Sequence, residues 1–386
     1  MKIAFVSENM NFCKPILKEL KKYHEVSVFK FSQEVNLERY ARLLHWADLI
    51  YCEWSDHLLQ VASWLASPEK KLVARIHRYE LYSKLLHEIR WRNVDLLVSN
   101  IASNHIVEKF KLNVEEKPKK ILVLPDGVDL KLWKFRKREF KKPYQICIVG
   151  NIIPRKGVYE LIRMFAGLPD YFELNIVGKR WPEYYVNCRE LIDELTDLGI
   201  DKRVKFWEHM EQDKLSEFFG KMHIIVSNST DEGNHTVIKE GMATGLYPVI
   251  NCWKGARETY PESCIFRTYE EFKKIILDWA ENAQKELESQ SARQWIKSRY
   301  DSEKQAEKLR KEIEALFSVE DQIKQEVDKE IGSVVGKKVK AKGLKKIIEI
   351  IKKNKEKKKL INSNDLINAE INKEVEDAKS ELSGSE

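Results

Sequence analysis

Short apolar runs rich in β-branched residues alternate with longer amphipathic segments along most of this chain. Such alternation predicts parallel sheets joined by right-handed helical crossovers, and runs that are apolar throughout suit strands buried on both faces. Helices are predicted between the runs, for example over 15–23, 83–91, 160–165 and 215–220. The predicted strands are KIAFVS (2–7), EVSVF (25–29), DLIYCE (48–53), LVARIH (72–77), DLLVS (95–99), ILVLP (121–125), QICIVG (145–150), ELNIVG (173–178), RVKF (203–206), IIVSN (224–228) and YPVIN (247–251).

The alternation is interrupted once, by a polar and basic segment between Pro125 and Lys142, and then restarts with the run at 145–150. A chain of 386 residues is too long for one ordinary compact domain. The interruption therefore predicts an α/β protein with two Rossmann-like domains, over residues 1–140 and 141–290.

The composition changes after a helical pattern that runs from about Asp301 to Phe317. Lys, Glu, Asn and Ser dominate the residues beyond it, which predicts a helical or disordered tail over 318–386. Residues 337–359 hold 12 Lys and 2 Glu, an excess of positive charge larger than the +7 of the whole chain. The basic character therefore belongs to the tail, and no nucleic-acid partner is expected.

The basic tract 337–361 also carries an apolar stripe with the spacing i, i+3, i+4, i+7, which indicates a basic amphipathic helix. Three interpretations stay open: contact with an anionic membrane surface, packing against a partner helix or a second copy, or a solvated extension. The stripe consists of Leu344, Ile347, Ile348 and Ile351.

Cysteine usage favours a reducing compartment. The six cysteines are scattered and form no C-x-x-C pair, so a disulfide framework is not expected. The first apolar run is too short for a signal-peptide core, and no stretch approaches the roughly 18 to 20 apolar residues of a membrane-spanning helix. We expect a cytoplasmic protein, with peripheral attachment to the cytoplasmic face of a membrane as one alternative.

A glycine-containing turn, GNIIPRKGVYELI (150–162), follows the first strand of the second predicted domain. Gly150 permits a tight turn and Gly157 permits a close backbone approach. Lys156 and Arg155 place positive charge where the next helix begins, and a helix N-terminus offers unpaired N–H groups to an anion. The loop suits a diphosphate, although by itself it also fits a surface lysine in an ordinary strand–helix loop.

Glu232 and Glu240 lie eight residues apart in STDEGNHTVIKEGMATGLYPVIN (229–251), at a second predicted strand-to-helix turn. Carboxylates on both sides of an anion-binding helix N-terminus can accept hydrogen bonds from sugar or ribose hydroxyls, which predicts a pocket for a sugar attached to phosphate. Alternatively, Glu232 is only a helix N-terminal charge and Glu240 a solvated helix residue. The small residues after Glu240 favour a tightly packed face and a carboxylate that points into a pocket.

Taken together, these motifs resemble glycosyltransferase family 4, the retaining nucleotide-sugar-dependent enzymes of the GT-B fold. Similar segments are LPDGVDLKLW (124–133), LNIVGK (174–179), RVKFWEHM (203–210) and ARIHRYE (74–80), so the resemblance spans residues 1 to about 317. It implies two Rossmann-like domains facing a central cleft, with a helix at 291–317 that completes the first domain. The family pattern S-x-x-E-G-x-G-x-x-x-x-E-A-M-A-x-G-x-P-V-I is met at Ser229, Glu232, Gly233, Glu240, Met242, Ala243, Gly245, Pro248, Val249 and Ile250.

The resemblance implies a role for each matching residue. Lys156 would bind the donor diphosphate, Glu240 the nucleotide ribose, and Glu232 the hydroxyls of the transferred sugar. His77, after a first-domain strand, would contact the donor sugar or leaving phosphate, whereas taken alone it also fits a satisfied core histidine. The implied catalytic set is His77, Lys156 and Glu232, and the implied donor-binding set is Arg155, Lys156, Gly233, Asn234, His235, Thr236 and Glu240.

The implied reaction moves a hexose-type sugar from a nucleotide-diphosphate sugar to a glycan, a lipid-linked or another acceptor, with retention of configuration, as in polysaccharide or glycolipid synthesis. Lys156, Arg155 and the helix N-termini would stabilise charge on the departing diphosphate. The sequence has no D-x-D motif and no Cys/His cluster with zinc spacing. No metal and no cofactor other than the nucleotide-sugar co-substrate are therefore expected.

The sequence departs from the family at four places. Asn151 stands where the family has an arginine, the loop 7–12 lacks the family's glycines, His235 replaces a glycine, and Tyr247 is an extra residue between Gly245 and Pro248. These departures keep a second function class open, a catalytically silent GT-B scaffold recruited through the basic tail. A GT-B epimerase or phosphorylase is a third interpretation, but no lysine is identifiable as a pyridoxal-phosphate ligand.

Overall fold

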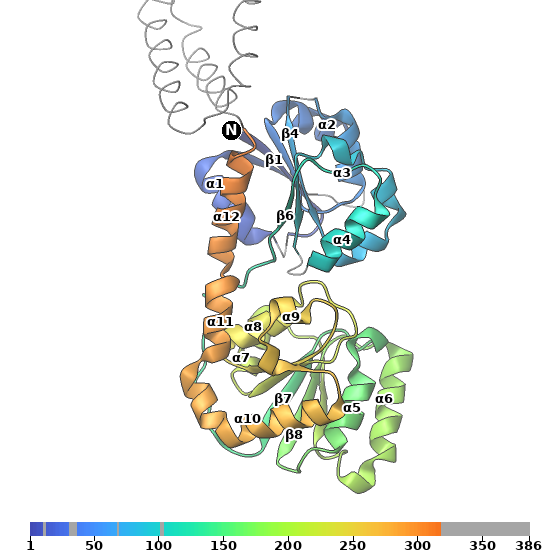
Figure 1. Ribbon diagram of the computed structural model, residues 1–386, viewed down its shortest axis with the longest axis vertical. Helices are drawn as coiled ribbons and strands as arrows, with labels where there is room; N and C mark the ends of the chain where they lie inside the picture. The colour runs from blue at the N-terminus through green and yellow to red at the C-terminus, as the bar shows by residue number, and fades with distance from the viewer. Residues whose placement is uncertain (11–12, 31–36, 68, 101–103, 318–386) are drawn as a thin grey trace, which may run out of the picture. The chain divides into compact units, whose positions relative to one another are not determined.

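The computed structural model describes residues 1–317 except 11–12, 31–36, 68 and 101–103. Within these residues the chain forms two six-stranded sheets, and helices pack on both faces of each (Figure 1). The predicted tail 318–386, including the basic tract 337–361, lies outside the described residues.

The first sheet is entirely parallel. Its strands are β1 (Lys2–Ser7), β2 (Glu25–Lys30), β3 (Leu49–Cys52), β4 (Lys71–Ile76), β5 (Leu96–Ser99) and β6 (Ile121–Val123), and its helices are α1 (Lys14–Tyr23), α2 (Leu37–Trp46), α3 (His57–Leu65) and α4 (Asn104–Asn113). The strand order is β2-β1-β3-β4-β5-β6, so the chain turns back at β1 and then progresses outward. The inner strands β3 and β5 are buried along their whole length, as apolar runs predict for a sheet covered on both faces.

The second sheet is parallel as well, with the order β12-β11-β10-β7-β8-β9. The order turns back at β7, which lies between β10 and β8. The strands are β7 (Tyr144–Val149), β8 (Phe172–Val177), β9 (Val204–Trp207), β10 (Ile224–Ser227), β11 (Tyr247–Asn251) and β12 (Ile265–Phe266), and the helices are α5 (Val158–Ala166), α6 (Pro182–Glu194), α7 (Gln212–Phe219), α8 (Thr236–Thr244), α9 (Ala256–Thr259), α10 (Tyr269–Ser289) and α11 (Ser291–Arg299). The last described helix, α12 (Ser302–Glu314), follows them and returns to the first half of the chain.

Each of the eleven predicted strands is present, with ends within one or two residues of those expected. The strand–helix alternation therefore predicts the fold class correctly, because the inner strands of a covered parallel sheet are buried on both faces. Strand β12 has no counterpart among the predictions, since two apolar residues form no recognisable period.

The helix predicted over 83–91 is absent. Two short 3-10 helices, Lys84–His87 and Trp91–Asn93, stand in its place. The indole N–H of Trp91 donates to the Leu86 carbonyl at 2.8 Å, and that of Trp64 donates to the Glu88 carbonyl at 2.9 Å. Two carbonyls that a continuous α-helix would use thus accept hydrogen bonds from indole groups, and the chain turns instead.

The predicted helix over 291–317 is divided into α11 and α12. The linker causes the break, because Val128 N donates to Tyr300 O at 2.6 Å and Ser302 N donates to Val128 O at 3.1 Å. Helix α11 packs against α8, while α12 packs against α1 in the first half of the chain. Arg310 Nε of α12 pairs with Glu19 of α1 at 3.1 Å, and Figure 1 shows the two helices side by side.

The cysteines are free thiols, and five of the six are buried. A thiol in an apolar surrounding acts as a small hydrophobic side chain. None of the helices within the described residues is both long and apolar enough to span a membrane.

Candidate functional site

Two loops meet at the carboxyl ends of neighbouring strands in the second sheet. Strand β7 leads into the loop 150–157, and the adjacent β10 leads into the turn 228–235. Thr230 N donates to Arg155 O at 3.0 Å, so the loops touch directly. The strand order turns back at β7, and open α/β sheets bind their ligands at such a switch point.

Four predicted site residues gather where these loops meet. Glu232 Oε1 accepts from Lys156 Nζ at 2.6 Å and from Arg155 Nη1 at 2.9 Å. Arg155 Nη1 also donates to Asp231 O at 2.6 Å, and Lys156 Nζ lies 3.3 Å from His235 Nε2. Residues separated by about 76 positions in sequence therefore form one charged cluster, with Glu232 between two cations.

The protonation states in this cluster follow from burial and from the neighbouring charges. Burial lowers the pKa of Lys156, although Glu232 opposes that shift. Burial also lowers the pKa of His235 to about 3, so this imidazole is neutral near pH 7. Burial disfavours ionised Glu232, but its basic neighbours His235, Lys156 and Arg155 hold the pKa of its carboxyl well below the usual range.

His235 adopts a left-handed backbone conformation with φ +35°, which is uncommon for a residue with a side chain. Three contacts hold it there. Its Nδ1 lies 2.9 Å from Ser227 Oγ, its Nε2 faces the Lys156 ammonium, and its carbonyl accepts from Tyr260 Oη at 3.4 Å. The turn before α8 is therefore rigidly positioned beside Lys156.

Backbone donors at this turn are available to a ligand. Helix α8 begins at Thr236, and the N–H groups of residues 233–236 donate to no acceptor among the described residues. Unpaired N–H groups and the helix dipole favour an anion at this position. The turn thus brings four backbone donors next to the Lys156 ammonium.

Glu240 lies one turn further along α8 and is only partly exposed. Burial raises the pKa of its carboxyl to about 7. Its carboxyl forms no hydrogen bond and no ion pair with any residue that the structure describes. A buried carboxyl without a protein partner is a strong candidate for contact with ligand hydroxyls.

His77 follows β4 in the first sheet and is 7% exposed. Its ring stacks on Trp54 with centroids 3.9 Å apart. Its Nε2 lies 3.2 Å from Glu53 O, and its Nδ1 lies 2.6 Å from Asn100 Nδ2. The side chain is therefore well partnered inside the protein, and the edge that it offers to a ligand is small.

The next residue brings the His77 segment to the second sheet. Arg78 pairs with Asp231, which directly precedes Glu232. Tyr82 Oη approaches the same Asp231 carboxylate at 3.5 Å. The loop after β4 and the turn before α8 are thus joined by an ion pair, which places His77 and Glu232 on elements that touch.

Several buried charged residues have no role predicted from the sequence, although Arg75, Asp126 and Lys239 lie within the segments quoted from it. A charged side chain inside an apolar strand is the signal that could have singled out Arg75 in LVARIH. Burial lowers the pKa of Lys239 to about 7. The set comprises Glu53, Arg75, Asp126 and Lys239.

No cluster of three or more His, Cys, Asp or Glu side chains suited to a metal ion occurs within the described part of the chain. The cations that the loops do supply are those of Lys156 and Arg155, at the starting turn of α5.

The loop 150–157 depends on a glycine. Gly157 has φ +64°, and a Cβ there would overlap the backbone oxygen of Asn228. We expect Gly157→Ala to lower the free energy of unfolding by about 2 to 4 kcal/mol, from left-handed strain plus overpacking. Urea unfolding would measure this. Gly199→Ala is the matched control, because Gly199 has φ +66° with nothing within 4 Å; an equal loss in both variants would contradict the role given to Asn228.

Comparisons with known proteins show a family match and a shared fold. Residues 130–311 match the family described as "Glycosyl transferases group 1". Comparison with curated proteins gives no match. HepE from Anabaena, solved in complex with UDP, is 20% identical with a TM-score of 0.66, and the match covers 82% of this chain and 100% of that chain.

Two other solved structures share the fold. Sucrose-phosphate synthase from Thermosynechococcus elongatus is 15% identical, with a TM-score of 0.63. The lipopolysaccharide outer core galactosyltransferase WaaB in its apo form is 15% identical, with a TM-score of 0.57. Each match covers 82% of this chain and 99% of the other. The chain therefore has the GT-B fold, and the match of residues 130–311 to the group 1 family indicates a glycosyltransferase.

Proposed function

We propose that this protein transfers a sugar from a nucleotide-diphosphate sugar to a glycan, lipid-linked or similar acceptor with retention of anomeric configuration, as an enzyme of family 4. The observation that carries the proposal is the turn before α8. It carries free backbone donors beside Glu232 and His235, which contact the Lys156 ammonium, and the unpartnered Glu240 carboxyl follows on the same helix. HepE, which has the same fold, was solved with UDP-glucose, so a UDP-sugar is the first donor to test.

Each part of the nucleotide-sugar donor has a proposed contact in the site. Lys156, Arg155 and the N–H groups of residues 233–236 hold the diphosphate and the sugar hydroxyls nearest to it. The Glu240 carboxylate accepts hydrogen bonds from the ribose, which explains why no protein group occupies it. Glu232 faces the transferred sugar and keeps Lys156 in position, and His77 closes the first-domain side of the reacting centre.

The electrostatics favour a front-face displacement. Glu232 is already engaged by Lys156 and Arg155 and its pKa is held low, so its carboxylate is a weak nucleophile. We propose instead that the bond from the anomeric carbon to the phosphate oxygen breaks as the acceptor oxygen approaches the same face. The acceptor proton passes to the leaving phosphate, and Lys156 stabilises the charge that develops there.

Turnover of nucleotide sugars tests the proposal. The full chain would be incubated with UDP-, GDP-, ADP- and dTDP-sugars and candidate acceptors, and the release of nucleoside diphosphate would be followed. We expect release with one donor class and a matching thermal shift, since a ligand at 100 times its Kd stabilises by about 2.7 kcal/mol. Nucleotide binding without turnover for every pair would favour the silent-scaffold alternative.

We also propose that the reaction needs no divalent metal ion. Lys156 and Arg155 would supply the positive charge that a divalent ion supplies in metal-dependent transferases. The measurable consequence is a rate that EDTA leaves unchanged. We also propose a cytoplasmic location, because free buried thiols suit a reducing compartment.

A further inference from the structure

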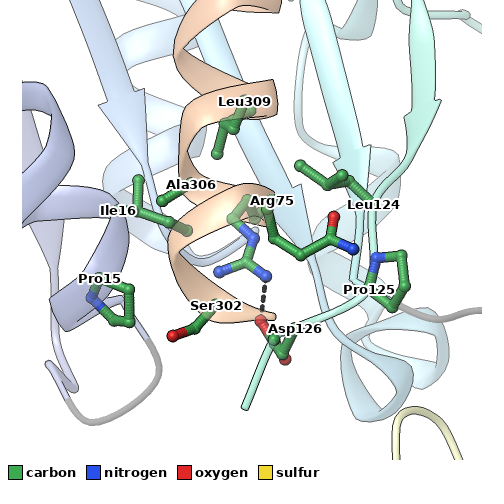
Figure 2. Close-up of a pocket in the computed structure, with 11 residues that line it drawn as sticks. Pro15, Ile16, Arg75, Leu124, Pro125, Asp126, Ser302, Ala306 and Leu309 are labelled. Carbon is green, nitrogen blue, oxygen red and sulfur yellow. Dashed lines mark hydrogen bonds and ion pairs between the residues drawn. The ribbon is translucent and has the colours of Figure 1, made fainter. Parts of the chain in front are cut away.

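Asp126 joins three parts of the chain through one carboxylate. It lies in the linker after β6, and its side chain is 9% exposed. Its Oδ1 accepts from Arg75 Nη2 of β4, and its Oδ2 accepts from Asn100 Nδ2 at 3.1 Å and from Asn234 Nδ2 at 3.0 Å. Figure 2 shows the Arg75–Asp126 pair at the edge of a small cavity between α1, the linker and α12.

Asp126 is ionised at neutral pH. Burial disfavours its charge, but the Arg75 guanidinium and other basic neighbours hold the pKa of Asp126 below its ordinary value. Arg75, 1% exposed, also pairs with Glu53 at 2.6 Å and is therefore fixed from two sides. An ionised carboxylate can only accept hydrogen bonds. Both asparagine amides must consequently turn their NH₂ groups, not their oxygens, toward Asp126.

The amide orientation of Asn100 determines the tautomer of His77. The same NH₂ group that faces Asp126 lies 2.6 Å from His77 Nδ1, so Nδ1 must be the acceptor. The ring proton then resides on Nε2, which lies 3.2 Å from the Glu53 carbonyl oxygen. An opposite amide orientation would direct the Asn100 oxygen at the Asp126 carboxylate, which repels it.

The amide of Asn234 is fixed at both ends. Its NH₂ group faces Asp126, and its oxygen accepts from Lys239 Nζ. Lys239 is fully buried, and its ammonium lies 4.0 Å from the centre of the Tyr300 ring. Asn234 belongs to the turn whose backbone donors face the proposed diphosphate site. Asp126 and Lys239 therefore hold that turn by hydrogen bonds at the two ends of one carboxamide.

We propose that Asp126 is a positioning residue for glycosyl transfer, which sets the His77 tautomer through Asn100 and the donor-binding turn through Asn234. Its effect on rate rests on the function proposed above, whereas its effect on the His77 tautomer does not. One linker carboxylate thereby aligns a group after β4 of the first sheet with a turn before α8 of the second.

Asp126→Asn is the decisive substitution, because it keeps the shape and replaces one acceptor oxygen by a donor. A carboxamide cannot accept from Arg75, Asn100 and Asn234 together, so at least one amide loses its orientation. We expect kcat/KM for the donor to fall by about 100-fold, as misplacement by about 1 Å can produce. We also expect the ¹⁵N signal of His77 Nδ1 to shift toward that of a protonated ring nitrogen, with assignment from a His77→Asn spectrum.

Asp95→Asn is the matched control. Asp95 is a buried carboxylate of the same sheet that accepts from Leu72 N at 2.8 Å and from Lys119 Nζ at 2.8 Å, before β5 begins. It lies at the opposite end of the strands from Asp126, so we expect unchanged kinetics and an unchanged His77 signal in this variant.

The double variant Asp126→Asn/Lys239→Met separates positioning from charge balance, because it removes the buried Lys239 cation together with its anion. We expect it to regain stability but not kcat/KM. Recovery of both stability and kcat/KM in the double variant would overturn the proposal. Wild-type kinetics together with an unshifted His77 signal in Asp126→Asn would overturn it as well. If the wild-type chain turns over no nucleotide sugar, the proposed function fails while the His77 signal still reports on Asp126.

Discussion

Replacing Lys156 with alanine should lower kcat for sugar transfer by about 10²- to 10³-fold, the effect of removing one group that stabilises transition-state charge. The side chain is 13% exposed and stands at the turn that starts α5. Charge that develops on the leaving diphosphate would meet this ammonium and the free N–H groups before α8. Among the described lysines and arginines, Arg155 is the other cation that pairs with Glu232.

Lys156→Arg tests whether charge alone is sufficient. The Lys156 stem lies against Gly150, where a Cβ would come within 3.3 Å of Lys156 Cε, so the space for a guanidinium is limited. We expect partial recovery of kcat, measured as release of nucleoside diphosphate at saturating donor. Lys221→Ala, at an exposed lysine shortly before β10 begins, is the control and should keep the wild-type rate. A Lys156→Ala enzyme within threefold of wild type would refute the assignment.

Glu240→Gln should weaken donor binding by about 10- to 100-fold with little change in kcat. Hydrogen bonds to a charged group contribute about 1.5 to 3 kcal/mol, and glutamine keeps the shape but not the charge. The ribose is remote from the bond that breaks, so the loss should appear in KM and in the Kd of the released nucleotide. Isothermal titration with the nucleoside diphosphate measures it directly.

The same substitution should stabilise the free protein at alkaline pH. Burial raises the pKa of Glu240 to about 7 from its usual 4.5, so between these values the folded protein binds more protons than the unfolded chain. The free energy of unfolding then falls as pH rises from about 4.5 to 7. Glu240→Gln cannot ionise, and we expect it to exceed wild type by about 1 to 3 kcal/mol at pH 8 and to match it at pH 4.5.

In the wild-type protein, the affinity for the donor should rise with pH, whereas the free energy of unfolding falls. The ionised carboxylate is the form that accepts from two hydroxyls, so affinity should rise as pH passes through 7, and Glu240→Gln should lose this dependence. Urea unfolding and titration at pH 6 and pH 8 test both statements. If the difference in stability between wild type and Glu240→Gln did not change with pH, the Glu240 carboxyl would be exposed to solvent and its pKa would not be raised by burial.

Much of the fold and part of the site can be predicted from local patterns. Apolar runs of five or six residues predict their strands because a parallel sheet buries both faces. The loop that contains Gly150, Lys156 and Gly157 can be predicted from the sequence, because a strand-to-helix turn needs particular backbone angles. The pairing of Glu232 with Lys156 is different, since 76 residues separate them and only the adjacency of β7 and β10 brings them together.

The sequence by itself determined the order of strands and helices and the two loops rich in donors and charge, because periodicity and turn chemistry act over a few residues. Only the tertiary structure decided which side chains face one another. Five residues form one connected set, because parallel strands gather their carboxyl ends at one edge of each sheet and the linker residue Asp126 bonds to residues of both. The set is Arg75, Asn100, Asp126, Asn234 and Lys239. Contacts across such distances in sequence depend on topology, so no local pattern could reveal that one linker carboxylate orients both His77 and the donor-binding turn.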